Sequence, residues 1–243
     1  MPLILETMGT VLSLTTPDPL PDELPEQIKK LLDLAEKTFS RFRPDSEISK
    51  INSGELSAEK ASEKYRAYLT LGESWQQATN GAFDISHPAG GIDLNGLVKA
   101  STMDEISALL LSNGCQDWCL NVGGDVLVSG SQPDETGSDT AWVAGIVDPN
   151  DRHKLLSEFT FEKPLLALAT SGVSERGEHI WGSSTEFQQV SIAAPGIITA
   201  DVLATAVMAG GSEVLQEMFA KYQLAALAIK RDGDLIATTH FVA

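Results

Sequence analysis

One short segment, residues 199–206 with the sequence Thr-Ala-Asp-Val-Leu-Ala-Thr-Ala, carries side chains whose spacing suits metal binding. If the segment is helical, Asp201 and Thr205 stand four residues apart and lie on one face. A carboxylate and a hydroxyl placed in this way offer two hard oxygen ligands to Mg²⁺, which often completes its shell with water and substrate phosphates. The alternative is that Thr199 or Asp201 caps the helix and has only a structural role.

Glycine-rich segments that follow predicted strands are a second group of candidates. They are residues 90–96, 121–125 and 170–172. Because glycine permits positive φ and close backbone approach, turns of this kind can surround a phosphate with amide groups. None has the spacing of a P-loop or of Gly-x-Gly-x-x-Gly, so an ordinary tight turn is the alternative for each. The pair Gly123-Gly124 stands out, since paired glycines within a strand indicate that something approaches the backbone closely.

Two single residues complete the candidates. Lys99 falls near the start of a predicted helix, where its charge opposes the helix dipole. An anionic partner would explain that position, and so would a solvated lysine. His179 follows the Thr-Ser-Gly segment and could bind phosphate or protonate a leaving group. No Ser-His-Asp or Gly-x-Ser-x-Gly arrangement is legible, which argues against a serine hydrolase.

Charge and cysteine content limit the possible partners. The chain has 34 acidic and 17 basic residues, a net charge of −17, which disfavours nucleic acid and anionic membrane surfaces. An anionic ligand must therefore be held by backbone amides, helix N-termini, a metal or a few placed cations. Cys115 and Cys119 match neither a zinc site nor a disulfide framework, and we interpret them as ordinary buried residues. We see no apolar run of membrane-spanning length and no secretory signal, and we expect a cytoplasmic protein.

The elements that must position these residues follow from periodicity. Helices are predicted at about 28–39, 58–78, 98–112, 201–209 and 212–221, with a loop at 39–47 before a short capped turn towards Asn52. Strands are predicted at 9–14, 118–129, 142–147, 155–161, 165–170, 187–194, 224–230 and 235–241. Alternation and hairpin turns favour an α+β fold with largely antiparallel sheets flanked by helices. No linker or repeat divides the chain, so we expect a single domain over residues 1–243.

Seven sequence blocks, taken in order, resemble the ApbE family of FAD:protein FMN transferases. The blocks are residues 8–10, 39–52, 81–84, 93–99, 121–125, 170–172 and 200–206. The resemblance covers nearly the whole chain and implies a two-lobed α/β architecture. It also favours the metal-binding interpretation of Asp201 and Thr205 over the cap.

The resemblance implies Mg²⁺-dependent transfer of FMN from FAD to a threonine hydroxyl of an acceptor protein, with release of AMP. The metal would be bound by Asp201, Thr205 and the backbone carbonyl at Val98, and the catalytic residues would be Asp201 and His179. Phe42 would lie against the flavin ring. The other residues implied to contact FAD are Asp84, Lys99, Gly123, Gly124, Asp125, Thr170, Ser171 and Gly172.

The implied acceptor is a flavoprotein with a threonine in an Asp-x-x-Ser/Thr-Gly-Ala/Ser-Thr motif. Residues 134–140 resemble this motif only faintly, and we interpret them as an exposed hairpin loop. The interval between Asp84 and Asp93 is shorter than is usual in the family, and no Asp-Pro-x-Thr-Gly segment follows His179. Two alternatives remain open: the same site could hydrolyse FAD to FMN and AMP, or it could bind FAD without turnover.

Overall fold

An eight-stranded sheet forms the centre of the molecule. The computed structural model describes residues 2–172 and 186–242. In spatial order the strands are β1 (Leu3–Thr7), β2 (Thr10–Thr15), β3 (Trp118–Val122), β4 (Asp125–Ser129), β9 (Ala167–Gly172), β10 (Phe187–Ala194), β11 (Ala225–Lys230) and β12 (Leu235–Ala237). Every neighbouring pair is antiparallel. The prediction of an α+β fold with largely antiparallel sheets is confirmed.

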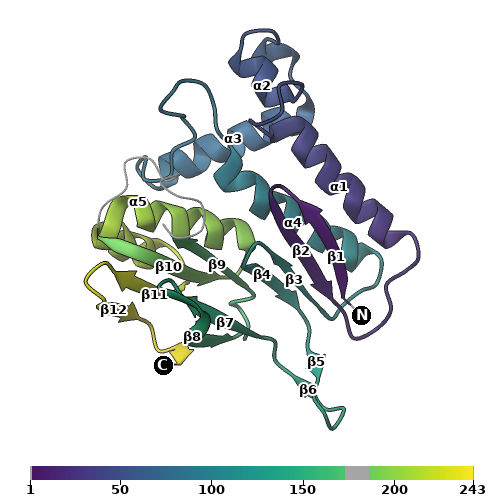
Figure 1. The fold of residues 1–243 in the computed structure, drawn as a ribbon, viewed down its shortest axis with the longest axis vertical. Coiled ribbons are helices and arrows are strands. Elements are labelled where there is room, and N and C mark those ends of the chain that lie inside the picture. Colours follow the sequence, from purple (N-terminus) through teal and green to yellow (C-terminus); the bar gives the residue numbers. More distant parts are fainter. Residues whose placement is uncertain (1, 173–185, 243) are drawn as a thin grey trace.

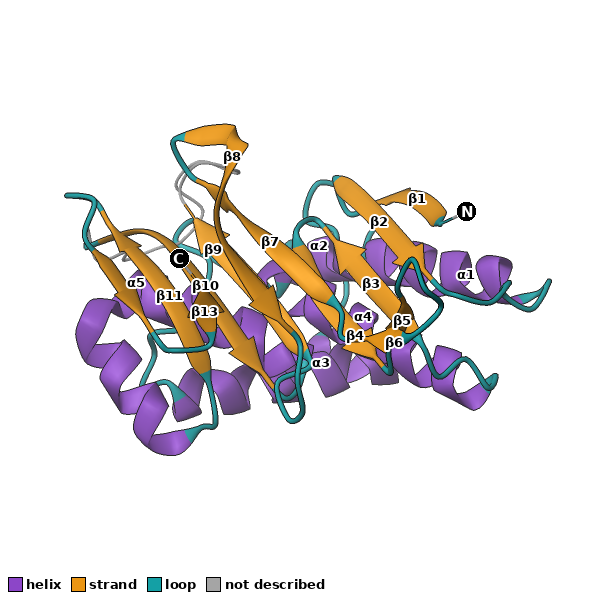
Figure 2. Ribbon diagram, turned by 90° about the horizontal axis from the view of Figure 1, so that it is seen from below, coloured by secondary structure: helices purple, strands orange, loops and turns teal. Residues whose placement is uncertain are grey.

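Helices cover one face of this sheet, as Figure 2 shows. They are α1 (Leu24–Phe39), α2 (Glu47–Asn52), the 3-10 turn η1 (Ala58–Lys60), α3 (Glu63–Ala78), α4 (Asn95–Ser112) and α5 (Ile197–Lys221). A smaller sheet of β7 (Val143–Asp148), β8 (Asp151–Thr160) and β13 (Phe241–Val242) packs on the other face. The hairpin of β5 (Gln132–Pro133) and β6 (Asp139–Thr140) projects from the body (Figure 1), which confirms the exposed loop predicted at 134–140.

Side-chain alternation along the central strands divides the core into two layers. On β11, Ala226 and Ala228 pack towards the helices, whereas Ala225 and Leu227 pack towards the smaller sheet. Successive side chains of a strand point to opposite faces, so a strand covered on both sides is apolar throughout. A third apolar cluster lies among the helices themselves, where α1, α2, α3, α4 and α5 meet.

Helix α5 differs from the prediction. It runs from Ile197 to Lys221 with non-helical dihedrals at Gly211 (φ 73°), so the two predicted helices are one kinked element. By length and composition α5 could cross a membrane, contrary to the expectation that no such run exists. It is, however, packed against β9 and β10, and 56% of its apolar window is buried inside the protein.

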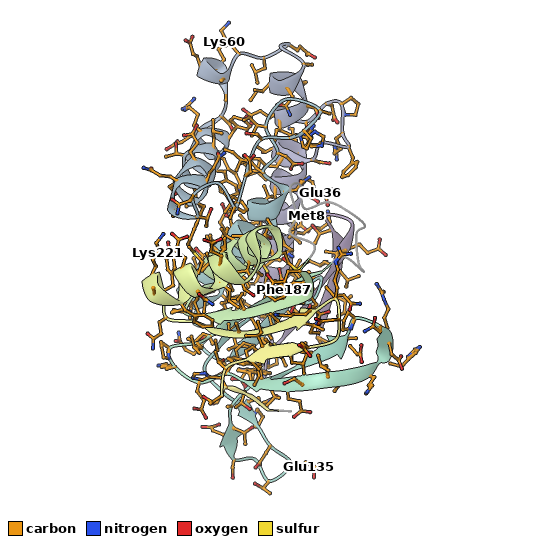
Figure 3. All side chains as sticks on the ribbon, turned by 90° about the vertical axis from the view of Figure 1, so that its left-hand side faces the viewer. Met8, Glu36, Lys60, Glu135, Phe187 and Lys221 are labelled. Carbon is orange, nitrogen blue, oxygen red and sulfur yellow. The ribbon has the colours of Figure 1, made fainter. Side chains whose placement is uncertain are left out.

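Two hairpins are present where the sequence predicted single strands. The first strand is β1, which precedes the predicted strand, and it joins β2 through Met8 (φ 46°) and Gly9 (φ 70°). Figure 3 shows Met8 beside Glu36, whose carboxylate accepts the Met8 amide at 2.6 Å. The predicted strand 118–129 is broken into β3 and β4, because Gly123 (φ 62°) and Gly124 (φ 95°) reverse the chain. Glycine is favoured at both positions because positive φ is strained for other residues.

The bounds of two further elements differ from those predicted. The predicted helix 58–78 begins only at Glu63, since the extended residue Ser62 caps α3 by accepting the Tyr65 amide at 3.1 Å. The predicted strand 235–241 is divided into β12 and β13, which belong to different sheets. The short turn towards Asn52 is helix α2, capped by Ser46 as expected. The single domain over residues 1–243 stays a prediction.

The hairpin at Gly123 provides a first test. A methyl group added at Gly123 would lie 2.8 Å from Thr10 Oγ1, and it would also impose strain at positive φ. We expect Gly123→Ala to lower the free energy of unfolding by about 2 kcal/mol in urea titrations. In a Thr10→Ala background the loss should be smaller, because the obstructing atoms are gone. Equal losses in both backgrounds would show that Thr10 does not restrict this turn.

Candidate functional site

Helix α5 places Asp201 and Thr205 inside the helix and not at its cap. The N-cap residue is Gly196, whose carbonyl accepts the Ala200 amide at 3.1 Å, and no side chain caps this end. Asp201 is only 5% exposed. The structural alternative, in which Thr199 or Asp201 caps the helix, is therefore wrong. The carboxylate and the hydroxyl share one helix face, as their spacing predicts.

A lysine and a second carboxylate reach Asp201 from other parts of the chain. Lys99, in the second turn of α4, pairs closely with Asp125 at the start of β4. Its ammonium nitrogen also lies 3.9 Å from Asp201 Oδ2. The Lys99 side chain is 16% exposed and that of Asp125 is 1% exposed, so Lys99 is not the solvated lysine of the alternative interpretation. The structure thus brings together three predicted site residues from α4, β4 and α5.

Strand β9 adds hydroxyl groups to this place. Ser171 Oγ lies 3.3 Å from Thr205 Oγ1, and Thr170 Oγ1 lies 2.8 Å from Ser191 Oγ on β10. The Thr170 amide donates to Asp125 Oδ1 at 3.1 Å. The segment ending at Gly172 is the end of β9, paired in register with β10, so the turn predicted for it is wrong. Its position in the ladder is what brings Ser171 against α5.

The paired glycines form the tight turn that was the alternative interpretation of this segment. The Gly123 amide donates to the Val11 carbonyl at 3.1 Å, and the Gly124 amide donates to Asn121 Oδ1 at 3.1 Å. Both amides are thus used within the protein. Gly123 and Gly124 lie directly before Asp125, which is the first residue of β4. The turn therefore determines where the Asp125 carboxylate lies.

An open hollow of about 380 Å³ reaches α5 at Ala209. It is lined by Gly81, Ala82, Asp84, Ser86, His87, Pro88 and Ala209. Ala209 follows Thr205 by one helical turn and therefore lies on the same face. The exposed Asp84 accepts the Ser86 amide and the Gln76 side-chain amide, each at 2.8 Å, so its carboxylate is oriented at the wall of this hollow.

Asn52, which was not among the predicted site residues, holds Ile92, and Ile92 forms a β-bridge with Ser86 at the wall of the hollow. Asn52 Nδ2 donates to the Ile92 carbonyl at 2.9 Å, and Asn52 Oδ1 accepts the Ile92 amide at 2.8 Å. The Asn52 side-chain amide thus makes the same two hydrogen bonds to the backbone of Ile92 that a residue of a neighbouring strand would make. Gly91 fits under it only because it lacks a Cβ, which would lie 2.6 Å from Asn52 Oδ1. Asn52 closes the block 39–52, and that resemblance was the one signal that could have identified it.

The remaining predicted residues lie apart or are engaged elsewhere. Phe42 is 90% exposed on the loop between α1 and α2. The Val98 carbonyl accepts the Thr102 hydroxyl at 2.7 Å within α4. His179 lies outside the described residues. Both cysteines are free and partly buried, and burial raises the pKa of the Cys119 thiol to about 11, which suits an unreactive residue.

The donor set fits a metal ion that the substrate helps to bind. Across residues 2–172 and 186–242, no group of three or more His, Cys, Asp or Glu side chains gathers in a way that could hold a metal. The site instead offers one buried carboxylate, Asp201, with the Thr205 hydroxyl on the same face. Mg²⁺ is commonly bound through one or two carboxylates plus substrate phosphates, so this set fits it.

Comparison with known proteins shows the family. The ApbE family model matches residues 8–90 and 86–228, and the chain belongs to that family. Flavin transferase ApbE from Vibrio cholerae has a similar structure, with a TM-score of 0.77 at 20% identity over 99% of this chain and 97% of that one. The ApbE protein of Thermotoga maritima gives a TM-score of 0.80 at 20% identity over 98% and 97%.

A third similar structure is the apo form of the Pseudomonas stutzeri flavinyl transferase ApbE. Its TM-score is 0.76 at 17% identity, over 99% of this chain and 95% of that one. At these identities the structural likeness establishes the fold that this chain shares with flavin transferases. A comparison with curated protein sequences gave no match.

The pairing of Asn52 with Ile92 yields a second prediction. We expect Asn52→Asp to lower the free energy of unfolding by about 2 kcal/mol, because a carboxylate oxygen would then face the Ile92 carbonyl without a donor. Hydrogen exchange at the Ile92 amide should accelerate. Asn113→Asp is the matched control, since Asn113 makes an exposed side-chain bond at the end of α4. Similar small losses in both variants would remove Asn52 as the residue that holds this loop.

Proposed function

We propose that this protein is a flavin transferase that moves FMN from FAD to a threonine hydroxyl of an acceptor protein, depends on Mg²⁺ and releases AMP. Membership of the ApbE family supports the class of reaction. The similar structures from Vibrio cholerae and Pseudomonas stutzeri, described as flavin and flavinyl transferases, support it further. Asp201 and Thr205 would hold the ion. The Val98 carbonyl, the further ligand that the resemblance implies, would have to release or share the Thr102 hydroxyl that it accepts here.

The observation that carries the proposal is the buried carboxylate of Asp201 on the same helix face as the Thr205 hydroxyl, with an open hollow one helical turn beyond Thr205 at Ala209. A buried carboxylate needs compensating positive charge; Lys99 supplies part of it 3.9 Å away, and a bound metal ion would supply more. Here the carboxylate is 5% exposed and lies on the helix face that continues to Ala209 in the hollow.

The chemistry needs few groups on the protein. The acceptor hydroxyl oxygen forms a bond to the FMN phosphorus, the bond from that phosphorus to the AMP phosphate oxygen breaks, and the hydroxyl proton must be removed. A bound Mg²⁺ ion supplies charge neutralisation at the diphosphate. The residues proposed to contact FAD would position the reacting phosphorus, and Asp84 stands at the hollow where part of the nucleotide would lie. His179 stays a candidate for proton transfer.

The proposal is tested with FAD, MgCl₂ and a peptide that carries the acceptor motif. Covalent flavin fluorescence on the peptide, dependent on magnesium and accompanied by AMP, is the expected result. Release of free FMN and AMP without labelled peptide would instead support hydrolysis of FAD. Unchanged FAD with retained binding would support a protein that binds FAD without turnover. The cytoplasmic location and the identity of the acceptor stay predictions from the sequence.

The metal-ligand assignment predicts the behaviour of two variants. Asp201→Asn should lower the transfer rate by about 10³-fold, because it removes the only charged ligand that we propose. Thr205→Val is nearly isosteric and should raise the magnesium concentration needed for half-maximal rate, with a smaller loss at saturation.

Both variants need a control on the same helix. Glu213 is an exposed residue of α5, so Glu213→Gln should leave rate and magnesium dependence unchanged. A near-normal rate in Asp201→Asn would remove this carboxylate from the site. If Thr205→Val changed only the melting temperature, its hydroxyl would be a packing feature.

Phe42 allows a test of flavin recognition that is separate from folding. Because its side chain is 90% exposed, Phe42→Ala should leave the melting temperature unchanged. Stacking of an aromatic ring is worth about 1 kcal/mol, so FAD affinity should fall by roughly fivefold to tenfold. AMP affinity, measured by calorimetry, should stay the same. Equal losses for both ligands would contradict the placement of Phe42 against the flavin.

A further inference from the structure

Lys99 lies between two buried carboxylates that belong to different elements. Its ammonium pairs closely with Asp125 on β4 and lies 3.9 Å from Asp201 Oδ2 on α5. The side chains of Asp125 and Asp201 are 1% and 7% exposed. Charges at such depth interact more strongly than charges in water, because less solvent screens them.

The contacts of Asp125 determine where this ammonium lies. Asp125 Oδ1 accepts the Thr170 amide at 3.1 Å, and the residue follows directly on the tight turn at Gly123 and Gly124. The carboxylate is therefore held by backbone on two strands, and Lys99 pairs with a nearly immobile partner. The closer contact to Asp125 than to Asp201 indicates that Asp125 is the anchor of the lysine.

We propose that Lys99 is a tethered counter-cation of Asp201: a positioning residue that neutralises the metal ligand before substrate arrives. Asp125, Lys99 and Asp201 together carry one net negative charge. A divalent ion that binds Asp201 must therefore do so against the ammonium, which weakens its binding in the absence of FAD. The diphosphate of FAD brings the further negative charge that makes metal binding favourable, so metal and substrate bind together. This inference rests on the proposed metal role of Asp201.

Metal binding without FAD is the direct test, with Mn²⁺ as the probe and its electron paramagnetic resonance signal as the readout. Lys99→Met should bind Mn²⁺ about tenfold more tightly than the wild type or better, because the competing charge is gone. Lys99→Arg keeps the charge and should stay close to the wild type. Asp125→Asn should bind Mn²⁺ more weakly, since it removes a negative charge and frees the ammonium to approach Asp201. The double variant should return towards the wild-type affinity.

Lys64→Met is the matched control. Lys64, on α3, pairs with the Glu105 carboxylate on α4. Its side chain is 16% exposed, as is that of Lys99. Its loss should leave Mn²⁺ affinity unchanged, which separates the proposed effect from the general loss of a half-buried lysine. Because Lys99→Met leaves two buried carboxylates without this ammonium, we also expect a lower melting temperature. Mn²⁺ should raise that temperature more in Lys99→Met than in the wild type.

Unchanged or weaker Mn²⁺ binding by Lys99→Met would overturn the proposal. So would a loss of metal-free FAD binding with unchanged Mn²⁺ affinity, which would assign the ammonium to the FAD diphosphate. Asp201→Asn distinguishes this failure from failure of the proposed function. If that variant keeps wild-type Mn²⁺ affinity, the metal site itself is wrong; if it loses Mn²⁺ while Lys99→Met has no effect, only the role of Lys99 is wrong.

Discussion

The buried ion pair between Lys99 and Asp125 is the interaction on which the candidate site depends. It joins α4 to the central sheet, and it places a positive charge 3.9 Å from the carboxylate of Asp201 on α5. Removing one member of a buried pair leaves an uncompensated charge, which is far more costly than losing an exposed pair. Attraction between these charges therefore stabilises the packing of α4, β4 and α5 at the place where their side chains would contact a ligand.

The rest of the fold serves this arrangement through two constraints on the backbone. The first is the hairpin at Gly123 and Gly124, whose positive φ values turn the chain directly before Asp125. The second is the pairing of β9 with β10 and β4, which brings the Thr170 amide to Asp125 and Ser171 to Thr205. A slip of β9 by one residue would turn Thr170 and Ser171 to the opposite faces of the sheet, so both contacts depend on this register.

Helix α5 is both strongly apolar and polar at one point. By length and composition it could cross a membrane, yet it carries the buried Asp201 carboxylate and the Thr205 hydroxyl on one face. Its partners are β9, β10 and α4, so the apolar character reflects a core position. Next to the kink at Gly211, the Glu186 carboxylate accepts hydrogen bonds from the Ser212 hydroxyl and from the Ser212 amide, the latter at 2.9 Å. These bonds, that of the hydroxyl first, lower the pKa of Glu186.

Local patterns predicted the class of fold, most helices, and the sharing of one helix face by Asp201 and Thr205, because periodicity and the i to i+4 relation are local. Lys99 was a candidate from its place in a predicted helix, and Asp125 and Ser171 were candidates from the family resemblance. A tight turn at Gly123 and Gly124 was one of two interpretations, and the structure selects it. The pairing of Lys99 with Asp125 and that of Asn52 with Ile92 are visible only in the folded chain. Those two contacts join residues far apart in the chain, and burial and strand register, which no local pattern encodes, select them.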